Sequence, residues 1–399
     1  MSKVLIITND YVGTERAGPA IRAWEMATVL SSEHSVILAS LSQPAADSDL
    51  FKVTHISKHS FFRFSEWADI IIIQPFILWF LPAISKLNKP LVVDIYNVWL
   101  IEALEANRNL PLPQKISAHQ SGLKLLGESL HNGDYFICSG ERQKDYWLGI
   151  LHYLGRVEPG YYANDPTAAN LIGIVPNGIS ARQPHHQKNV LKGVSAGIRQ
   201  SDKLLIWGGS VCNWFDPVTL VKAMALLKRY RNDIKLFFMG LKAPNKKIGD
   251  HIWSEADKAV VISKKLGVYE KEVFFNLSWI PFAERENYLL EADLGITLHF
   301  NNLETRYSFR TRVLDYLWAE LPIITSEGDM MSELVDKHNL GRIVPYRDAA
   351  KVAEAIVELL DNKKVYQKCQ GSIRSIKIDL YWENVMQPLI EYCRNPWRK

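Results

Sequence analysis

Short apolar runs alternate with helical patterns along almost the whole chain. The most continuous of these runs is Asp69-Ile-Ile-Ile-Ile73. Continuous apolarity of this kind is typical of a strand in a parallel sheet, because helices cover both faces of such a sheet. Strands that alternate with helices indicate a doubly wound α/β fold. We therefore expect an α/β chain built on parallel sheets.

The alternation forms two series, and a polar segment lies between them. Gly, Pro and polar residues cluster in residues 176–188, which is typical of a linker. We expect two Rossmann-like domains facing a central cleft, residues 1–180 and 181–375. Residues 376–399 would then form a tail, a helix that packs back on the N-terminal domain. The predicted strands are 3–7, 35–41, 52–56, 69–73, 91–95, 135–139, 173–175, 203–207, 235–239, 273–277, 295–298 and 322–325. The predicted helices are 20–30, 77–87, 118–131, 141–154, 217–229, 284–292, 331–338 and 349–360.

Charge and cysteine content narrow the class of protein. The net charge is only +4 over 399 residues, so we expect no nucleic-acid partner. The four cysteines, Cys138, Cys212, Cys369 and Cys393, are scattered without zinc spacing, which fits a reduced cytosolic setting. The N-terminal apolar run is too short for a signal peptide. We therefore expect a cytoplasmic protein.

Residues 70–84 are the one segment that suggests a membrane. Gln74, Pro75 and Pro82 interrupt it, and it is shorter than a bilayer requires. A buried strand that turns into a helix explains it better. Its aromatic part still allows peripheral contact with the inner face of a membrane.

The segment from Glu304 to Pro322 carries the densest group of charges next to predicted strands. It lies between the apolar runs 292–300 and 321–325. A helix N-terminus with nearby arginines suits a phosphate group. A carboxylate further along the helix, Asp315, can accept hydrogen bonds from a ribose diol. This pattern predicts a nucleotide-sugar site, and a surface helix with solvated charges is the alternative.

Three arginines in this segment are candidates for the phosphate contact, namely Arg306, Arg310 and Arg312. Arg310 at the helix start is the best of them, and we expect at least one of the three to be structural. On a helix, Ser308, Arg312 and Asp315 share one face, so an ion pair between Arg312 and Asp315 is the alternative to ribose binding. Ser308 and Phe309 complete the donor-binding residues of this segment.

Other candidate residues come from loops that follow predicted strands. Gly208 and Gly209 follow the strand 203–207 and let the backbone approach a ligand, although a plain turn gives the same signal. Asn213 and Trp214 lie on the same loop, where Trp214 either stacks on a ligand or packs in the core. Glu304 either contacts hydroxyls of a sugar or is a solvated loop charge. The histidines show no metal spacing, and we expect a hydrogen-bonded structural role for His299.

At this point the chain resembles the GT-B glycosyltransferases of the large retaining family 4, the glycosyl transferases group 1, over essentially its whole length. Four segments carry the resemblance. These are the loop Gly13-Thr-Glu-Arg-Ala-Gly-Pro19, the segment Val175-Pro-Asn-Gly-Ile179, the turn Trp207-Gly-Gly-Ser210, and Asp315-Tyr-Leu-Trp-Ala-Glu-Leu-Pro322. The last of them resembles the family's Glu-Ala-Met-Ala-Ala-Gly-Leu-Pro and is the most specific.

Two departures from the family pattern affect the donor site. Asp315 matches the second of two family glutamates, but Tyr307 occupies the position of the first, and Glu304 lies three residues earlier. The family's Arg and Lys after the first strand of the second domain are absent from residues 208–216. The diphosphate contact would then come from the arginines of residues 304–315.

The resemblance implies transfer of a hexosyl-type sugar from a nucleoside-diphosphate donor to a hydroxyl of a saccharide or lipid-linked acceptor. It implies retention, no cofactor and no metal, and a setting in polysaccharide or glycoconjugate biosynthesis. The first domain would bind the acceptor and the second the donor. A GT-B epimerase, a sugar phosphorylase and a non-catalytic sugar- or lipid-binding scaffold are the alternatives. The implied catalytic residues are Glu304, Arg310 and Asp94, and those on the acceptor side are Gly13, Arg16, Gly18 and Tyr96.

Overall fold

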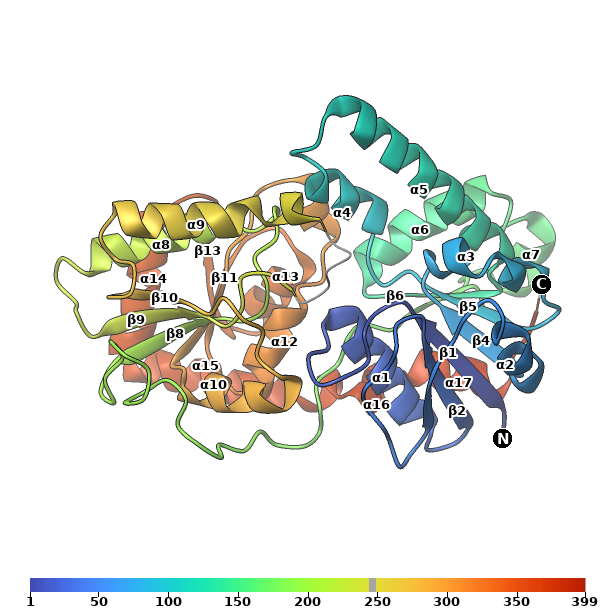
Figure 1. Ribbon diagram of the computed structural model, residues 1–399, viewed down its shortest axis with the longest axis horizontal. Helices are drawn as coiled ribbons and strands as arrows, with labels where there is room; N and C mark the ends of the chain where they lie inside the picture. Colours follow the sequence, from blue (N-terminus) through green and yellow to red (C-terminus); the bar gives the residue numbers. More distant parts are fainter. Residues whose placement is uncertain (244–248, 399) are drawn as a thin grey trace. The chain divides into compact units, whose positions relative to one another are not determined.

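The computed structural model describes residues 1–243 and 249–398, and they form two compact units (Figure 1). The first unit comprises Met1–Ala103, Pro111–Gly178 and the C-terminal segment from Trp382. The second comprises Leu104–Leu110 and Ile179–Tyr381. Each unit is built on one parallel sheet with helices on both faces, which confirms the predicted α/β fold class.

The sheet of the first unit has seven parallel strands in the order β3-β2-β1-β4-β5-β6-β7. The chain order reverses between β1 and β4, which is where ligands bind in open sheets of this type. The strands are β1 (Lys3–Thr8), β2 (Ser35–Ser40), β3 (Lys52–His55), β4 (Ile70–Ile73), β5 (Leu91–Asp94), β6 (Tyr135–Cys138) and β7 (Ile172–Ile174).

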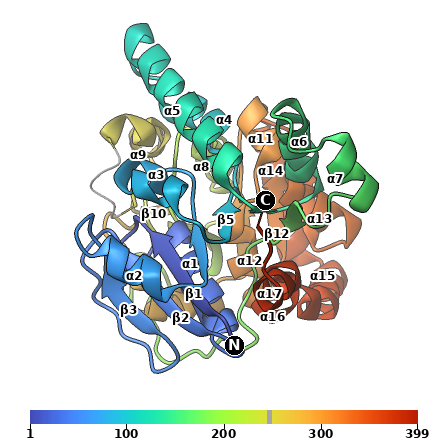
Figure 2. The same ribbon diagram turned by 90° about the vertical axis from the view of Figure 1, so that its right-hand side faces the viewer.

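Helices from both ends of the first unit's sequence cover one face of its sheet. Val4 and Ile6 of β1 pack in one core with α1 and with the C-terminal helices α16 and α17 (Figures 1 and 2). Trp382, Met386 and Leu389 bring the tail into this core. The helices of the unit are α1 (Gly18–Leu30), α2 (Phe61–Trp67), α3 (Ile77–Phe80), α4 (Trp99–Ala106), α5 (Leu112–Asn132), α6 (Glu141–Tyr153), α7 (Pro159–Asn164), α16 (Trp382–Val385) and α17 (Gln387–Arg394).

The helix predicted over residues 77–87 is wrong as one element. The structure has α3 and then a 3-10 helix, Pro82–Lys86, with Leu81 between them. Pro82 has no backbone N–H to continue the α-helical hydrogen bonds, so the first helix ends before it. Within the described residues, no helix is both long enough and apolar enough to cross a membrane.

The sheet of the second unit has six parallel strands in the order β10-β9-β8-β11-β12-β13. Here the chain order reverses between β8 and β11. The strands are β8 (Lys203–Trp207), β9 (Ile234–Phe238), β10 (Val273–Phe275), β11 (Leu294–Thr297), β12 (Ile323–Ser326) and β13 (Gly341–Val344). The helices are α8 (Pro217–Leu227), α9 (Ser254–Lys265), α10 (Arg285–Glu291), α11 (Leu303–Tyr307), α12 (Thr311–Trp318), α13 (Met330–Lys337), α14 (Ala349–Asp361) and α15 (Lys363–Ile376).

Alternate residues of the second unit's strands enter two separate cores. Leu205 and Trp207 pack with α8, α9 and α14, whereas Leu204 and Ile206 pack with α10, α12, α13 and α15. Side chains of a strand point to opposite faces in turn, so an uninterrupted apolar run fills both cores. The carboxyl ends of β8 and β11 are therefore fixed from both sides.

Candidate functional site

The hydroxyl group of Tyr316 connects α12 by hydrogen bonds to the sheet at the switch point between β8 and β11. The backbone N–H of Gly208 donates to its hydroxyl oxygen at 2.8 Å, and that hydroxyl donates to the carbonyl of Ile296 at 2.8 Å. A Cβ on Gly295 would lie only 2.3 Å from the tyrosine ring, so the ring needs glycine beneath it. Sequence reasoning missed Tyr316, although a glycine inside an apolar strand signals close packing.

Arg312 is held beside the turn that follows β8. Its Nη2 donates to the carbonyl of Ser210 at 2.7 Å, and its guanidinium lies 3.9 Å from the Phe215 ring centroid and 4.9 Å from that of Trp207. Burial lowers the pKa of Arg312 to about 10, so the side chain stays charged at neutral pH. Gly209 adopts φ +71°, which favours glycine. In the described part of the chain, Nη1 of Arg312 is buried without a hydrogen-bond partner.

Glu304 and Arg310 form a buried bidentate ion pair. Nη1 and Nη2 of Arg310 lie 2.8 and 2.7 Å from the two carboxylate oxygens of Glu304, and both residues are at least 94 % buried. Nε of Arg310 lies 3.3 Å from Oδ2 of Asp329. The solvated loop charge considered for Glu304 is therefore wrong, because Glu304 belongs to α11 and is paired. The guanidinium of Arg310, which was expected to contact the phosphate, is instead paired with the carboxylates of Glu304 and Asp329, and it orients Glu304.

His299 and Asp329 continue this buried cluster. Nε2 of His299 donates to the carbonyl of Glu327 at 3.0 Å, and its Nδ1 lies 3.5 Å from Oδ2 of Asp329. Burial, with the charge of Arg310 adding to it, lowers the pKa of His299 to about 3, so the imidazole is neutral. Asp329 also caps α13 through the N–H of Ser332. The described residues contain no group of three or more His, Cys, Asp and Glu side chains that could hold a metal ion.

Asp315 pairs with an arginine that sequence reasoning did not consider. Its Oδ1 lies 2.9 Å from Nη1 of Arg285, and the ion pair with Arg312 that was the alternative to ribose binding does not form. The guanidinium of Arg285 lies 3.9 Å from the Phe282 ring centroid. The Asp315 side chain is 32 % exposed and can still be reached by a ligand.

The face expected to join Ser308 with Arg312 and Asp315 is wrong. α12 begins at Thr311, and Ser308 lies at the end of α11 instead. The Ser308 hydroxyl donates to the carbonyl of Glu304 at 2.8 Å and contacts its carboxylate at 2.5 Å. Ser308 and Asp315, which the predicted face placed on one helix, therefore belong to different elements, Ser308 to the end of α11 and Asp315 to α12. Of the remaining donor candidates here, Arg306 is exposed and Phe309 is half-buried.

The side chains of Asn213 and Trp214 both contact other residues of the second unit. The amide nitrogen of Asn213 donates to the carbonyls of Glu105, Ala106 and His251, and its oxygen accepts from Ser254. Trp214 is buried, with its ring centroid 5.9 Å from that of Phe215. Trp214 therefore packs in the core, which was the alternative considered for it, and Asn213 forms hydrogen bonds within the protein.

In the first unit, Asp94 is ion-paired rather than open. Nε and Nη2 of Arg22 lie 2.7 and 2.8 Å from its two carboxylate oxygens, and Nη2 also donates to the carbonyl of Val175. Burial raises the pKa of Asp94, and the charge of Arg22 opposes that shift. The guanidinium of Arg22 lies 4.9 Å from the ring of Tyr96, so the two predicted residues share one neighbour. Sequence reasoning missed Arg22, although an arginine on the apolar face of a predicted helix calls for a buried partner.

The predicted acceptor-side residues Gly13 and Arg16 lie between β1 and α1, and Gly18 begins α1. Gly13 is buried, and the guanidinium of Arg16 lies 4.1 Å from the Trp24 ring centroid. They follow β1, next to the switch point of the first sheet. Their acceptor role stays a prediction.

A known protein family matches part of the chain. Residues 202–362 match the family described as glycosyl transferases group 1. This stretch lies within the second unit and includes Gly208, Arg312 and Asp315. No curated protein sequence matches the chain.

Solved structures match both units. A sucrose-phosphate synthase from Thermosynechococcus elongatus is 13 % identical, with 99 % of this chain and 98 % of that one covered and a TM-score of 0.68. HepE from Anabaena, in complex with UDP and glucose, is 11 % identical, with 99 % and 100 % covered and a TM-score of 0.67. WaaG, a glycosyltransferase involved in lipopolysaccharide biosynthesis, is 15 % identical, with 98 % and 100 % covered and a TM-score of 0.64. These similarities establish the fold as GT-B, with two Rossmann-like domains.

Proposed function

We propose that this chain is a retaining glycosyltransferase that moves a hexosyl-type sugar from a nucleoside diphosphate to a hydroxyl group. The GT-B fold and the family match over residues 202–362 support this class of enzyme. The observation that carries the proposal is Arg312, a charged side chain fixed beside the Gly208–Gly209 turn with one buried nitrogen unpaired. An unpaired buried donor is costly, and a phosphate oxygen would satisfy it.

The leaving group explains why a cation is needed at this position. Negative charge grows on the diphosphate as the bond from the sugar C1 to the phosphate oxygen breaks. Arg312 and the backbone N–H groups of the turn would stabilise that charge, which lowers the barrier. Arg312 would thus replace the Arg and Lys that are absent from residues 208–216. The reaction would then need no metal ion and no cofactor.

The carboxylates of the second unit fit the neutral parts of the donor. Asp315, partly exposed and oriented by Arg285, would accept hydrogen bonds from the ribose. Glu304, oriented by Arg310, would contact hydroxyls of the transferred sugar. The new bond would form between C1 and the acceptor oxygen on the same face, and the leaving phosphate would take the acceptor proton. No general base of the protein is then required.

The donor and the setting are proposed from similar proteins. HepE is in complex with UDP and glucose, which makes UDP-glucose the first donor to test. A saccharide or lipid-linked acceptor in polysaccharide or glycoconjugate biosynthesis fits the likeness to WaaG. Trp79 and Phe80, 62 % and 39 % exposed, support peripheral contact with a membrane, and a cytoplasmic location at its inner face is part of the same proposal.

Calorimetric titration with UDP, GDP, dTDP and ADP tests the donor site. We expect one diphosphate to bind, and Arg312→Ala to weaken it at least tenfold and to lower kcat by ~100-fold, the scale of losing one donor to a developing charge. Arg342→Ala is the matched control, because Arg342 pairs with Glu358 at the surface of the same unit. Binding by none of the four nucleotides, or equal affinity of the Arg312 and Arg342 variants, would reject the proposal. Release of UDP and free sugar without an acceptor would instead indicate an epimerase.

A further inference from the structure

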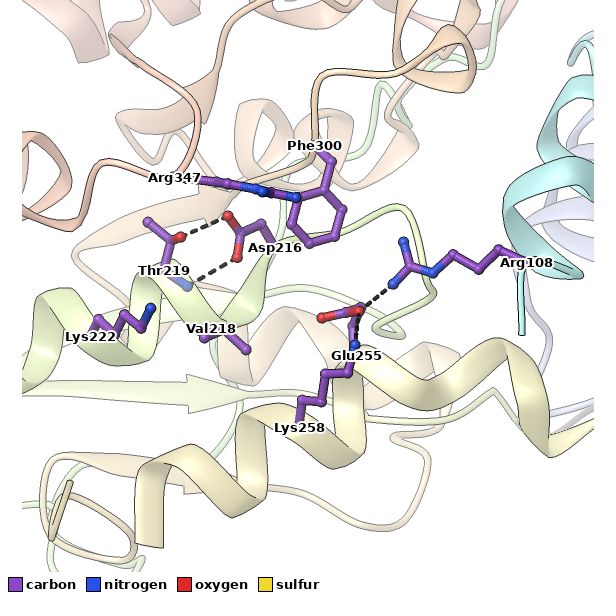
Figure 3. A pocket seen from close by; sticks show the side chains of 9 residues that line it. All are labelled: Arg108, Asp216, Val218, Thr219, Lys222, Glu255, Lys258, Phe300 and Arg347. Atoms are coloured by element: carbon purple, nitrogen blue, oxygen red, sulfur yellow. Dashed lines mark hydrogen bonds and ion pairs between the residues drawn. The ribbon is translucent and has the colours of Figure 1, made fainter. Parts of the chain in front are cut away.

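A cavity of the second unit has no part in the proposed donor site. Its volume is about 460 Å³, roughly fifteen times the share of one water molecule in the liquid. Neither Arg312 nor the Gly208–Gly209 turn lines it. The lining residues come from α8 and its N-cap, α9, the loop after β11, the turn after β13 and the segment Leu104–Leu110 (Figure 3).

Cations predominate around this cavity. Four cationic side chains, those of Arg108, Lys222, Lys258 and Arg347, face two carboxylates, those of Asp216 and Glu255. Four like charges gathered from separate segments repel one another, and only part of that repulsion is offset by the two carboxylates. The wall therefore carries a formal excess of two positive charges.

Both carboxylates already have hydrogen-bond or ion-pair partners within the protein. Asp216 is 97 % buried and caps α8, accepting from the N–H and the hydroxyl of Thr219 at 3.0 and 2.7 Å. Glu255 is 96 % buried and contacts Nη2 of Arg108, with Nζ of Lys258 at 2.8 Å. Figure 3 shows these contacts at the base of the cavity. Arg108 and Lys258 are thus partly neutralised.

The other two cations are not neutralised in this way. Within residues 1–243 and 249–398, the side chains of Lys222 and Arg347 form no ion pair and no hydrogen bond. The charge of Arg347 acts on Asp216, where it opposes the rise in pKa that burial causes. An anion placed in the cavity would give both cations a partner.

The Phe300 ring lies near two arginines of the cavity wall. One of them, Arg347, has φ +58°, a left-handed conformation that glycine adopts more readily than other residues. Its guanidinium lies 5.1 Å from the Phe300 ring centroid, and that of Arg108 lies 5.6 Å from the same ring. The ring holds two planar guanidinium groups at the cavity wall, and such groups match phosphate oxygens.

We propose that this cavity binds a phosphorylated small molecule, with Lys222 and Arg347 contacting the phosphate. The cavity is larger than a bare phosphate ion requires and lies within the size range of small-ligand sites. A sugar phosphate fits this description: Phe300 supplies an apolar wall for the ring, and the cations face the phosphoryl group. The ligand is distinct from the donor diphosphate, because neither Arg312 nor the Gly208–Gly209 turn lines the cavity.

Calorimetric titrations of the full chain with glucose 6-phosphate, inorganic phosphate and glucose test the proposal. We expect glucose 6-phosphate to bind more tightly than phosphate and glucose not to bind. The double variant Lys222→Gln/Arg347→Gly should weaken glucose 6-phosphate at least tenfold and change UDP affinity less than twofold. Glycine suits the left-handed conformation at residue 347, so the fold should persist.

A control double variant, Lys265→Gln/Asn339→Gly, reproduces the lysine change and the glycine change away from the cavity. Lys265 is exposed and Asn339 has φ +55°, so this variant removes one of the two positive charges that the test variant removes and changes the backbone at a comparable left-handed position. It should bind glucose 6-phosphate like the original chain. The proposal is overturned if glucose 6-phosphate does not bind, if both double variants bind it equally, or if inorganic phosphate binds as tightly. It is also overturned if Arg312→Ala removes this binding, since the probe would then occupy the donor site.

Discussion

Arg310 lies between two buried carboxylates, those of Glu304 and Asp329. A buried charge that loses its partner is much more costly than an exposed one, because water cannot replace the lost contact. We expect Glu304→Ala to lower the free energy of unfolding by about 3–5 kcal/mol. Urea denaturation followed by circular dichroism measures this change.

The exposed ion pair of Arg342 with Glu358 is the control for that experiment. Glu358→Ala should cost less than about 1 kcal/mol, because both side chains are partly solvated. Equal losses in the two variants would show that the pair at Glu304 and Arg310 is not shielded from water.

His299 makes the stability of the chain depend on pH. In the unfolded chain the imidazole binds a proton below about pH 6.5, whereas burial keeps it neutral in the fold down to a pKa of about 3. The unfolded state then binds more protons between these values, so the free energy of unfolding falls as the pH falls. From pH 6.5 to 5 the loss from this residue should reach about 2 kcal/mol.

Urea denaturation at several pH values between 5 and 7 tests this dependence. His299→Gln keeps an N–H donor for the carbonyl of Glu327 but has no group that titrates in this range. As the pH is lowered, the free energy of unfolding of this variant should fall less than that of the original chain. The difference between the two is the contribution of His299. Parallel pH profiles for the two chains would contradict a neutral buried imidazole.

At the scale of single residues, the sequence indicated where charged side chains gather, but it did not indicate which of them form ion pairs. The sequence singled out the charges of residues 304–315 as a group, without indicating which side chains pair with one another. Arg310 faces Glu304, and Asp315 faces Arg285, which lies thirty positions before it in the sequence. Helical spacing could not indicate these pairs, because α11 and α12 are separate helices and Arg285 belongs to α10.

At the scale of elements, β11 and α12 depend on each other through one glycine. A methyl group on Gly295 would lie 2.3 Å from the Tyr316 ring, so the helix would have to shift away from the sheet. We expect Gly295→Ala to destabilise the chain by about 1–3 kcal/mol, the usual cost of overpacking a core. Thermal denaturation followed by circular dichroism measures the change.

Gly371 of α15 offers the opposite case. A Cβ added there meets nothing within 4 Å, and alanine favours a helix over glycine by about 1 kcal/mol. Gly371→Ala should therefore raise the melting temperature, while Gly295→Ala lowers it. A decrease of equal size in both variants would show that Gly295 has no special role under Tyr316.

Strands were easier to predict than short helices and edge elements. The strand predicted over residues 203–207 coincides with β8, because its continuous apolar run fills both cores. β13 was missed, because only its first and last residues are buried and its pattern therefore lacks an apolar run. α9 was missed as well, since most of its surface is polar. An uninterrupted apolar run is the clearest signal of a strand, although β3, which has no buried residue, was predicted as well.

At the scale of the whole molecule, the chain order alone does not give the composition of each unit. The C-terminal helices α16 and α17 belong to the first unit, although the second unit precedes them directly in the sequence. Apolar side chains at helical spacing near residue 390 show only that a partner exists, so this spacing is not the source of the expectation that the tail packs on the N-terminal domain. Which sheet they cover depends on the path of the chain, and a sequence pattern of period 3.6 does not contain that path.

The tail therefore gives a prediction about the two units as separate folding units. Ending the chain after Tyr381 would remove Trp382, Met386, Leu389 and Ile390 from the core around β1 and β4. Burying side chains of this size contributes about 1.5–3 kcal/mol each. Losing all four therefore removes an energy comparable to the whole stability of a typical domain, which is about 5–15 kcal/mol.

Hydrogen exchange read by mass spectrometry should show β1 and β4 unprotected in the shortened chain. β8 and β11 should remain protected, because none of the removed residues enters their cores. Equal loss of protection in both sheets would show that the two units unfold together.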